Sequence, residues 1–470
     1  MKRLIFLFFL LPLSALAQVE VLTKEWKKDK ELRHASIGFC VMKASDSSPI
    51  AEYNSETALV PASTLKVITT SAALGLLGPA YRFETRIGYT GSFDAGTGVI
   101  DGDLIIFGSG DPSLQSEYFY PKTESLTDTW AKTLKQKGVR SITGALVGYA
   151  GLYPREVPDQ WIWGDIGNYF GAVPCGLNFM DNKFAIRLSG GENGHASEVL
   201  SVSPVYKHRN ISITASVVAR GSSDQAYVYG DPFGWEKHIK GNIPVKRNPF
   251  EIEAALPDPA LLCAETLNQS LKTLGIVCGK NARSDYSAAA PDITSLYSHF
   301  SQPLSKLIYH TNQTSDNLYC ESILRTLGKG DIQAGIEAVT AFWKSRGLNT
   351  DEVFMTDGSG LSRASSLTPH FQAALLCKIY RDSNNYKIIN ASLPAAGLQG
   401  SMASLGRGSF IQNNLRAKTG YLTRVRAYCG YVKTKRGEVL AFSIIFNNFN
   451  CSPARARLEI EKWMLAIAEL

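Results

Sequence analysis

The type of secondary structure that the sequence predicts changes twice along the chain, and this change constrains the architecture more than any single motif does. From Phe83 to about Val245 the chain consists of short β-type runs, such as RIGYTGSF and ISITASVVARG, separated by Gly, Asp and Pro. On both sides of this region, helix-like and strand-like segments alternate. Because a compact domain builds its layers around one core, the pattern predicts an α/β domain that is split by a β-rich insertion.

Outside the insertion, turn signals and apolar periodicity predict individual elements. Two strands are expected over 36–43 and 49–53, joined by a turn rich in Ser and Asp. A helix is expected over Thr64–Leu77, because Pro61 suits a helix start and Gly78-Pro79 ends the segment. Apolar residues at helical spacing predict helices over four further segments: Asp258–Leu274, Pro303–Leu327, Ile332–Arg346 and Ala454–Leu470. Two strand-like runs, Ala417–Tyr431 and Val439–Asn447, predict a hairpin around the turn Lys433–Glu438, with Gly437 in its loop.

The first 17 residues have the pattern of a secretory signal peptide. Met1-Lys2-Arg3 is basic, Leu4–Leu13 is almost wholly apolar but too short to span a bilayer, and Ala15-Leu16-Ala17 forms a small-x-small cleavage site. A buried N-terminal helix is the weaker alternative, because a core helix rarely begins at residue 4 without a polar face. We therefore expect an exported protein, periplasmic or otherwise extracytoplasmic, that is soluble and has no transmembrane segment in its mature chain.

Charge and cysteine usage argue against several classes of function. The 49 basic and 42 acidic residues give a formal net charge of +7, and the basic residues are spread along the chain rather than clustered. No nucleic-acid partner is therefore expected. Three of the eight cysteines, Cys40, Cys377 and Cys429, lie in apolar segments typical of free buried thiols, so no disulfide is expected. Without a Cys-x-x-Cys or His-Glu-x-x-His motif, the sequence predicts no metal site and no cofactor.

The tetrapeptide Ser63-Thr64-Leu65-Lys66 lies at the expected helix start and is a candidate catalytic pair. Residues three apart share a helix face, so the Lys66 amine can reach the Ser63 hydroxyl. A Ser hydroxyl becomes a good nucleophile only when a base removes its proton, so Lys66 must be neutral in the working state. Burial and a neighbouring positive charge would both lower its pKa. The pattern alone is weak, because an ordinary surface Ser and Lys would satisfy it as well.

Two further motifs strengthen this interpretation. Ser315-Asp316-Asn317 follows a helical run, and Lys418-Thr419-Gly420 begins an expected strand. The order Ser-x-x-Lys, Ser-x-Asn, Lys-Thr-Gly resembles that of the penicillin-recognising serine enzymes. A second Ser-x-Asn begins at Ser383, but Ser315 precedes Lys418 by about a hundred residues, the usual spacing in those enzymes, whereas Ser383 precedes it by only about 35.

Each motif supplies a group that acyl transfer needs. Ser315 can pass a proton between Lys66 and a leaving amine, and Asn317 can orient Lys66 and hydrogen-bond a substrate amide. Lys418 and Thr419 can bind a substrate carboxylate, and the strand that continues through Gly420 can pair with an extended peptide. The backbone N–H groups of Ser63 and Tyr421 would form an oxyanion hole.

The resemblance narrows to one family of these enzymes. Gly108-Ser109-Gly110-Asp111-Pro112, Asp357-Gly358-Ser359-Gly360-Leu361-Ser362-Arg363 and about 250 residues between the first two motifs make the chain similar to the low-molecular-mass class C penicillin-binding proteins. The resemblance implies a β-lactamase/transpeptidase-like domain, α/β (α+β) with an antiparallel sheet and helices, over 18–83 and 290–470. It also implies a β-rich insertion over 84–289, with a nested subdomain around 187–250.

The same resemblance implies an activity, partners and one further residue. Members of this family are D-alanyl-D-alanine carboxypeptidases or endopeptidases that cleave peptidoglycan stem peptides and take β-lactam antibiotics as covalent inhibitors. An Asp after a Trp-x-Trp element faces the substrate's side-chain amine in that family, and Asp165 of Trp161-Ile162-Trp163-Gly164-Asp165 matches it. Tyr421 departs from the family pattern, which usually has Ser there; a backbone donor survives the change, but the larger side chain would narrow the site.

Two alternatives use the same residues differently. A β-lactamase or esterase would share the scaffold, but the large insertion is costly for so small a substrate and the sequence shows no dedicated deacylation base. A non-catalytic wall-binding protein with a relic site is disfavoured by the intact motifs. The sequence has no Gly-x-Ser-x-Gly elbow, which argues against an α/β-hydrolase.

Overall fold

The computed structural model describes residues 15–121 and 123–470, which divide into two compact units. Of the described residues, the first unit contains 15–64, Leu348–Phe354 and Ser366–Leu470, and the second contains 65–121, 123–347 and Met355–Ser365. Residues 1–14 of the expected signal peptide lie outside the described residues. Of the helices in the described part of the chain, none is long and apolar enough to cross a membrane.

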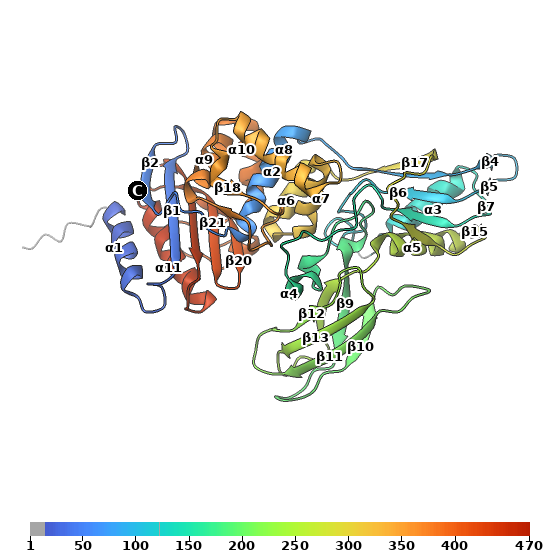
Figure 1. Ribbon diagram of the computed structural model, residues 1–470, viewed down its shortest axis with the longest axis horizontal. Helices are drawn as coiled ribbons and strands as arrows, with labels where there is room; N and C mark the ends of the chain where they lie inside the picture. Colours follow the sequence, from blue (N-terminus) through green and yellow to red (C-terminus); the bar gives the residue numbers. More distant parts are fainter. Residues whose placement is uncertain (1–14, 122) are drawn as a thin grey trace, which may run out of the picture. The chain divides into compact units, whose positions relative to one another are not determined.

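The first unit is built on a five-stranded antiparallel sheet with the strand order β2-β1-β22-β21-β20 (Figure 1). Its strands are β1 (Ser36–Lys43), β2 (Pro49–Tyr53), β20 (Leu415–Leu422), β21 (Val425–Lys433) and β22 (Val439–Asn447). The two N-terminal strands have the limits expected from the sequence, and the predicted hairpin around Gly437 joins β21 to β22. The single run expected over Ala417–Tyr431 is instead two strands, β20 and β21, because the chain turns back between Leu422 and Val425. Because both faces of β1, β21 and β22 are covered, these strands are buried along nearly their whole length.

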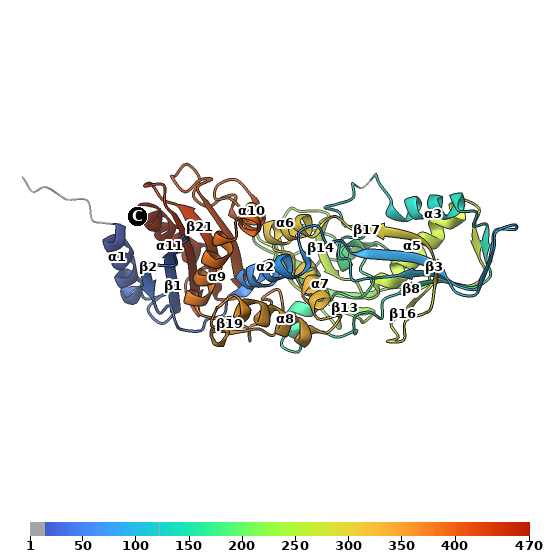
Figure 2. The same cartoon turned by 90° about the horizontal axis from the view of Figure 1, so that it is seen from above.

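Helices cover the two faces of this sheet (Figure 2). On one face α1 (Ala15–Lys28) packs on α11 (Pro453–Ala468), and α11 packs on β21. The core between them is aromatic and includes Trp26, Phe39, Phe442 and Trp463. On the other face α9 (Pro369–Arg381) packs on β1 and β22 and is followed by α10 (Ser383–Ser392). Short elements complete the unit: η4 (Thr350–Glu352), β18 (Val353–Phe354), β19 (Ser366–Leu367) and η5 (Gly400–Met402).

A cluster of four helices forms part of the second unit. α2 (Lys66–Leu77) contacts α6 (Leu304–Thr314), α7 (Asn317–Leu327) and α8 (Ile332–Ser345). The stretch expected as one helix over Pro303–Leu327 is therefore two helices, which meet at the Ser-x-Asn motif. The expected helix over Thr64–Leu77 begins instead with a 3₁₀ turn, η1 (Ala62–Leu65), and becomes α-helical at Lys66.

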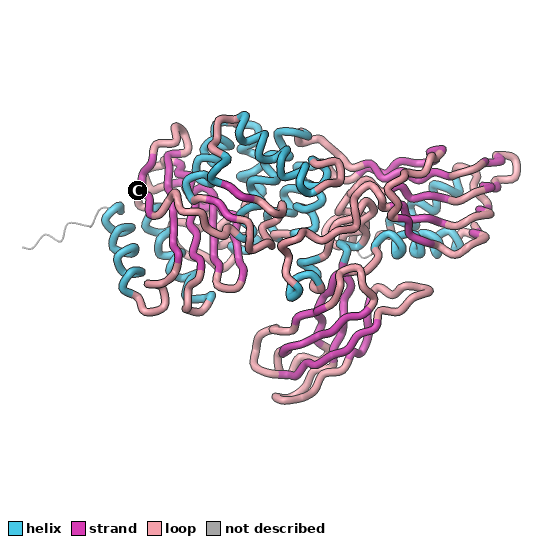
Figure 3. The backbone as a smooth tube through the Cα atoms, viewed as in Figure 1, coloured by secondary structure: helices cyan, strands magenta, loops and turns pink. Residues whose placement is uncertain are grey.

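The remainder of the second unit contains four sheets (strands are magenta in Figure 3). A mixed five-stranded sheet, β16-β8-β6-β3-β17, pairs β8 in parallel with both β6 and β16. Helices α3 (Leu126–Gln136) and α5 (Pro259–Thr273) pack on each other and on this sheet. Its strands are β3 (Glu84–Tyr89), β6 (Leu104–Phe107), β8 (Leu146–Tyr149), β16 (Arg283–Asp285) and β17 (Thr294–Phe300). Three short helices also belong to the second unit: α4 (Trp163–Ile166), η2 (Tyr169–Gly171) and η3 (Met180–Asn182).

The other three sheets of this unit are small. Their strand orders are β15-β7-β5-β4, β10-β9-β14 and β11-β13-β12. Their strands are β4 (Ser92–Asp94), β5 (Val99–Asp101), β7 (Ser141–Ile142), β9 (Lys183–Leu188), β10 (Val199–Ser203), β11 (Ser212–Ala219), β12 (Tyr227–Tyr229), β13 (Glu236–Ile243), β14 (Phe250–Ala255) and β15 (Val277–Cys278). The domain limits expected from the sequence remain predictions.

Candidate active site

Ser63 lies in the 3₁₀ turn η1, and its segment is fixed to the sheet of the first unit. Val60 and the Asn447 side chain exchange two hydrogen bonds, of 2.8 Å and 3.1 Å. Gln372 of α9 donates to the Thr64 carbonyl at 3.2 Å. Ala62, directly before Ser63, has a φ of 47°, a left-handed conformation that costs energy for a residue with a Cβ. The half-buried Ser63 is thus presented by a strained turn whose neighbours are held firmly.

The Lys-Thr-Gly motif lies on β20, the last strand of the same sheet. Lys418 is buried and its Nζ donates to the Thr419 carbonyl at 2.9 Å, while Thr419 Oγ1 donates to Ser401 Oγ at 2.8 Å. A Cβ on Gly420 would lie 2.5 Å from the Pro61 carbonyl oxygen, so only glycine permits this approach of β20 to the turn that carries Ser63. Tyr421 is 53% exposed, with the Arg426 guanidinium over its ring.

Lys66 begins α2 in the second unit and has no exposed surface. Its Nζ donates to Asn317 Oδ1 at 2.5 Å and to the Ser359 carbonyl oxygen at 2.8 Å. Both acceptors can bind Lys66 as a neutral amine, the form that is able to take a proton from a hydroxyl group.

Electrostatics around Lys66 favour this neutral form. Burial, the largest cause, lowers the pKa of Lys66, because a charged amine loses its hydration there. Cys320, Asp357, Glu321 and Asp316 act in the opposite direction. The lowered pKa agrees with the sequence-based requirement for a neutral base, and its principal cause is burial.

Ser315 and Asn317 flank the junction between α6 and α7. Ser315 caps the end of α6 with a φ of 66°, and Asp316 begins α7 by accepting from Tyr319 N. Asn317 Nδ2 donates to the Phe170 carbonyl oxygen at 2.7 Å, so the amide is held at both ends. The structure therefore joins Asn317 directly to Lys66, while the orienting role expected of Asn317 remains a prediction.

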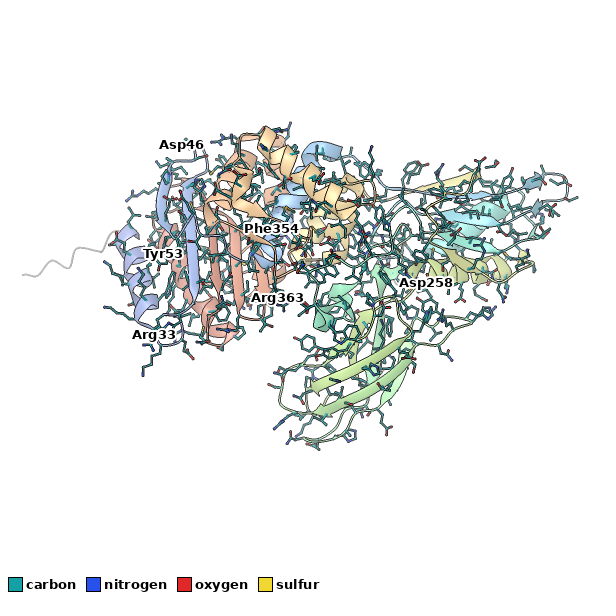
Figure 4. The ribbon with its side chains drawn as sticks, viewed as in Figure 1. Arg33, Asp46, Tyr53, Asp258, Phe354 and Arg363 are labelled. Carbon is teal, nitrogen blue, oxygen red and sulfur yellow. The ribbon has the colours of Figure 1, made fainter. Side chains whose placement is uncertain are left out.

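The Trp-x-Trp element of the second unit is bonded to the segment Asp357–Arg363. Trp161 Nε1 donates to Asp357 Oδ2 at 3.0 Å. Asp165, in α4, forms an ion pair of 2.9 Å with Arg363 Nη1 (Arg363 is labelled in Figure 4). Asp165 is 8% exposed, so this ion pair is largely shielded from solvent on the Asp165 side.

Sequence reasoning assigned no role to three groups that contact this site. They are the Ser359 carbonyl, which accepts from Lys66, Glu321, which binds the backbone of Gly358 and Ser359, and Arg363, which pairs with Asp165. The sequence identifies Asp357–Arg363 only as one of the segments that resemble the family, and it predicts no contact for them. The i, i+4 relation of Asn317 and Glu321 on one helix is the signal that could have indicated Glu321.

The described residues hold no group of three or more His, Cys, Asp or Glu side chains arranged to bind a metal. All eight cysteines are free thiols in the structure.

The sequence pattern of the D-Ala-D-Ala carboxypeptidase 3 (S13) family matches residues 18–469. The chain is 26% identical to D-alanyl-D-alanine carboxypeptidase DacB of Haemophilus influenzae over 456 residues, which cover 94% of this chain and 90% of that protein. The crystal structure of penicillin binding protein 4 (dacB) from H. influenzae matches with a TM-score of 0.81 at 25% identity, covering 96% of this chain and 99% of the other. A second crystal structure of that protein, complexed with a novel β-lactam, matches with a TM-score of 0.74 at 25% identity, covering 95% and 98%. The fold class expected from the sequence is confirmed.

Proposed function

The chain belongs to the D-Ala-D-Ala carboxypeptidase 3 (S13) family, and on this premise we propose that it is a serine D-alanyl-D-alanine carboxypeptidase acting through an acyl-Ser63 intermediate. Its substrates are peptidoglycan stem peptides that end in D-Ala-D-Ala, and cleavage of peptide cross-links is the corresponding endopeptidase reaction. The observation that carries the proposal is the buried Lys66, whose Nζ donates to Asn317 Oδ1 and to the Ser359 carbonyl. Burial lowers the pKa of this amine and so favours the neutral form, which can take a hydroxyl proton.

Acylation joins the groups in one sequence. Lys66 takes the proton of Ser63 as Ser63 Oγ attacks the carbonyl between the two D-Ala residues. The backbone N–H groups of Ser63 and Tyr421 stabilise the oxyanion. Ser315 then passes the proton to the leaving amine, so that D-Ala departs and the shortened peptide remains as an ester on Ser63.

Water completes the cycle by hydrolysing this ester, which releases the peptide and restores the Ser63 hydroxyl. A penicillin enters the same path when Ser63 opens its β-lactam ring, but no leaving group departs, so the acyl-enzyme persists. The H. influenzae relative that was crystallised with a β-lactam supports this part of the proposal.

The position of β20 supports peptide binding by strand addition. β20 is the last strand of its sheet, and the bridge from Ala395 to Arg416 covers its outer edge only before the Lys-Thr-Gly motif. An extended peptide can therefore add to the edge that follows. Lys418 and Thr419 provide the positive charge and the hydroxyl for its terminal carboxylate.

Mass spectrometry of defined products tests the proposal. Incubation with a stem pentapeptide should release one D-Ala and leave the tetrapeptide, and intact cross-linked muropeptides should be split if the endopeptidase reaction also operates. Rapid turnover of a chromogenic cephalosporin without release of D-Ala would instead indicate a β-lactamase. If the protein catalyses neither reaction and is not acylated by penicillin, these results would indicate a non-catalytic wall-binding protein.

Export is part of the proposal, and the N-terminal pattern of residues 1–17 supports it. Cleavage after Ala17 would make Gln18 the first residue of the mature protein. The intact mass of protein recovered from the extracytoplasmic fraction of expressing cells measures this directly, and a mass that includes residues 1–17 would contradict it.

Replacing Ser315 with alanine should slow acylation by about 10²–10⁴-fold, the usual contribution of a proton-transfer group. Alanine keeps a Cβ at the positive φ of this position, so the substitution removes the hydroxyl without changing the backbone strain. The matched control is Ser383→Ala, in the second Ser-x-Asn, at the start of α10. Stopped-flow acylation by a reporter penicillin measures both variants; equal rates would contradict the assignment of the motif.

Replacing Asp165 with asparagine should weaken recognition of a substrate's side-chain amine. A charged hydrogen bond contributes about 1.5–3 kcal/mol, so kcat/KM should fall about 10–100-fold for a peptide with a free amine on the residue before D-Ala-D-Ala. The same peptide with that amine acetylated should be hydrolysed at nearly the wild-type rate. An equal loss on both peptides would show that Asp165 acts only through its ion pair with Arg363.

A further inference from the structure

The segment Asp357–Gly360 presents two consecutive carbonyl oxygens to α2 and α7. Thr69 Oγ1 and Cys320 Sγ donate to the Gly358 carbonyl, at 2.8 Å and 3.1 Å. The next carbonyl, of Ser359, accepts from Lys66 Nζ at 2.8 Å. One of the two acceptors that hold the catalytic amine is thus a main-chain group, whose position depends on whatever fixes this segment.

Glu321 fixes it from the opposite side of the same peptides. The Gly358 N–H lies 3.0 Å from Glu321 Oε1 and 3.1 Å from Oε2, and the Ser359 N–H donates to Oε1 at 2.7 Å. The Glu321 residue is 1% exposed. A Cβ on Gly358 would lie 2.9 Å from Leu324 Cβ, so glycine lets the segment approach α7 closely enough for these bonds.

Asn317 and Glu321 are four residues apart on α7 and therefore share one face of the helix. Asn317 holds the Lys66 amine directly, and Glu321 holds the carbonyl that binds the same amine. The Asn317 side chain and the Ser359 carbonyl, which both accept from Lys66, are accordingly positioned by the same helix.

We propose that Glu321 is a positioning residue for the base Lys66: by binding the N–H groups of Gly358 and Ser359, it fixes the Ser359 carbonyl that directs the Lys66 amine. This inference rests on the proposed function, in which Lys66 activates Ser63. Glu321 touches neither the substrate nor the reacting atoms, and it acts through Ser359.

The charge of Glu321 adds an effect that position alone does not produce. Lys66, Asp357, Cys320 and Arg325 are the titratable groups around it. Burial and the nearby Asp357 raise the pKa of Glu321 to about 7, whereas burial keeps the Cys320 thiol neutral by raising its pKa. An ionised Glu321 stabilises the Lys66 ammonium, so removing the charge should make Lys66 lose its proton at lower pH.

Three variants of the full-length mature protein separate these effects. Glu321→Ala removes both the bonds and the charge, and Glu321→Gln removes the charge but keeps an amide oxygen for the two N–H groups. Glu265→Ala is the matched control, because Glu265 is also buried on a helix and accepts a backbone N–H, that of Lys207, at 2.7 Å. The second-order rate of acylation by a reporter penicillin is measured against pH, and folding is checked by thermal unfolding.

Glu321→Ala should acylate about 100-fold more slowly than wild type, as expected when a reacting group loses its alignment. Glu321→Gln should recover most of that rate, within about tenfold of wild type, and its acidic limb should shift to lower pH. Glu265→Ala should match wild type at every pH. A merely structural Glu321 would give no shift of the acidic limb in the glutamine variant.

The inference is overturned if folded Glu321→Ala acylates as fast as Glu265→Ala, or if the acidic limb of Glu321→Gln coincides with that of wild type. Should Glu321→Ala fail to fold, the pH profile of Glu321→Gln decides alone. If wild type and Glu321→Ala are acylated at the same rate, this inference alone is refuted. If wild type is not acylated at all, the proposed function and this inference are refuted together.

Discussion

Replacing Ser63 with alanine should abolish covalent labelling by penicillin and lower the release of D-Ala by roughly 10⁴–10⁶-fold, the loss typical when an acyl-transfer enzyme loses its nucleophile. The variant has no oxygen at Cβ, so no acyl ester can form. Its fold should persist, because the contacts that fix the turn are made by Val60 and Thr64 rather than by Ser63 alone. Intact-mass spectrometry after incubation with penicillin, beside thermal unfolding of both proteins, measures this.

Ser401→Ala is a useful comparison for this variant. Ser401 lies in the same unit and its hydroxyl accepts from Thr419, yet it is not proposed as a nucleophile. It should still gain the mass of one penicillin. Stable labelling of Ser63→Ala at another serine would contradict the assignment of the nucleophile.

The sequence predicted those elements of the first unit that turn residues mark locally. The limits of the strands 36–43 and 49–53 could be read directly, whereas the helices α1, α9 and α10 were not predicted. The Ser-x-Asn motif was placed after a helical run, but the immediate restart of the helix was not predicted, because only a backbone φ of 66° at Ser315 separates α6 from α7. A single left-handed residue leaves almost no trace in apolar spacing.

The part of the chain expected to be an insertion, 84–289, was predicted less completely than the segments on either side of it. Helix α3 was missed among short β-type runs, although Ser125 caps it and Leu126, Trp130 and Leu134 recur on one buried face. The parallel pairing of β8 with β6 could not be predicted, because register between distant strands depends on tertiary contacts.

In the candidate site, functional groups that belong to side chains could be predicted from the sequence. Functional groups of the main chain could not. The hydrogen bond between Lys66 and Asn317 joins two motifs that the sequence already marked. The Ser359 carbonyl carries no signature in its side chain, and Glu321 resembles any acidic residue of a helix. Sequence reasoning also left open the main cause of the lowered pKa of Lys66, since only the structure shows how completely the residue is buried.

Replacing Lys66 with methionine should slow acylation by at least about 10²–10⁴-fold, because Ser63 then lacks a base. The same substitution also tests the protonation state of Lys66, through the pH dependence of the free energy of unfolding. Burial lowers the pKa of Lys66 in the folded protein, whereas the unfolded chain keeps a value of about 10.4. Between these two values the unfolded chain binds more protons, so the unfolding free energy of wild type should rise with pH relative to the variant, by up to about 1.4 kcal/mol per unit.

Lys237→Met is the control variant that separates the effect on stability from the effect on acylation. Lys237 is also fully buried, its Nζ donates to the Asp231 carbonyl at 2.6 Å, and burial lowers its pKa to about 8. Its removal should change the pH dependence of stability with the same sign, over pH values between about 8 and 10.4, and leave acylation intact. Denaturant titrations at several pH values measure the free energy of unfolding, and the rate of penicillin acylation measures catalytic function. A stability difference between wild type and Lys66→Met that falls as pH rises would mean that Lys66 is held as an ammonium, a form that cannot deprotonate Ser63.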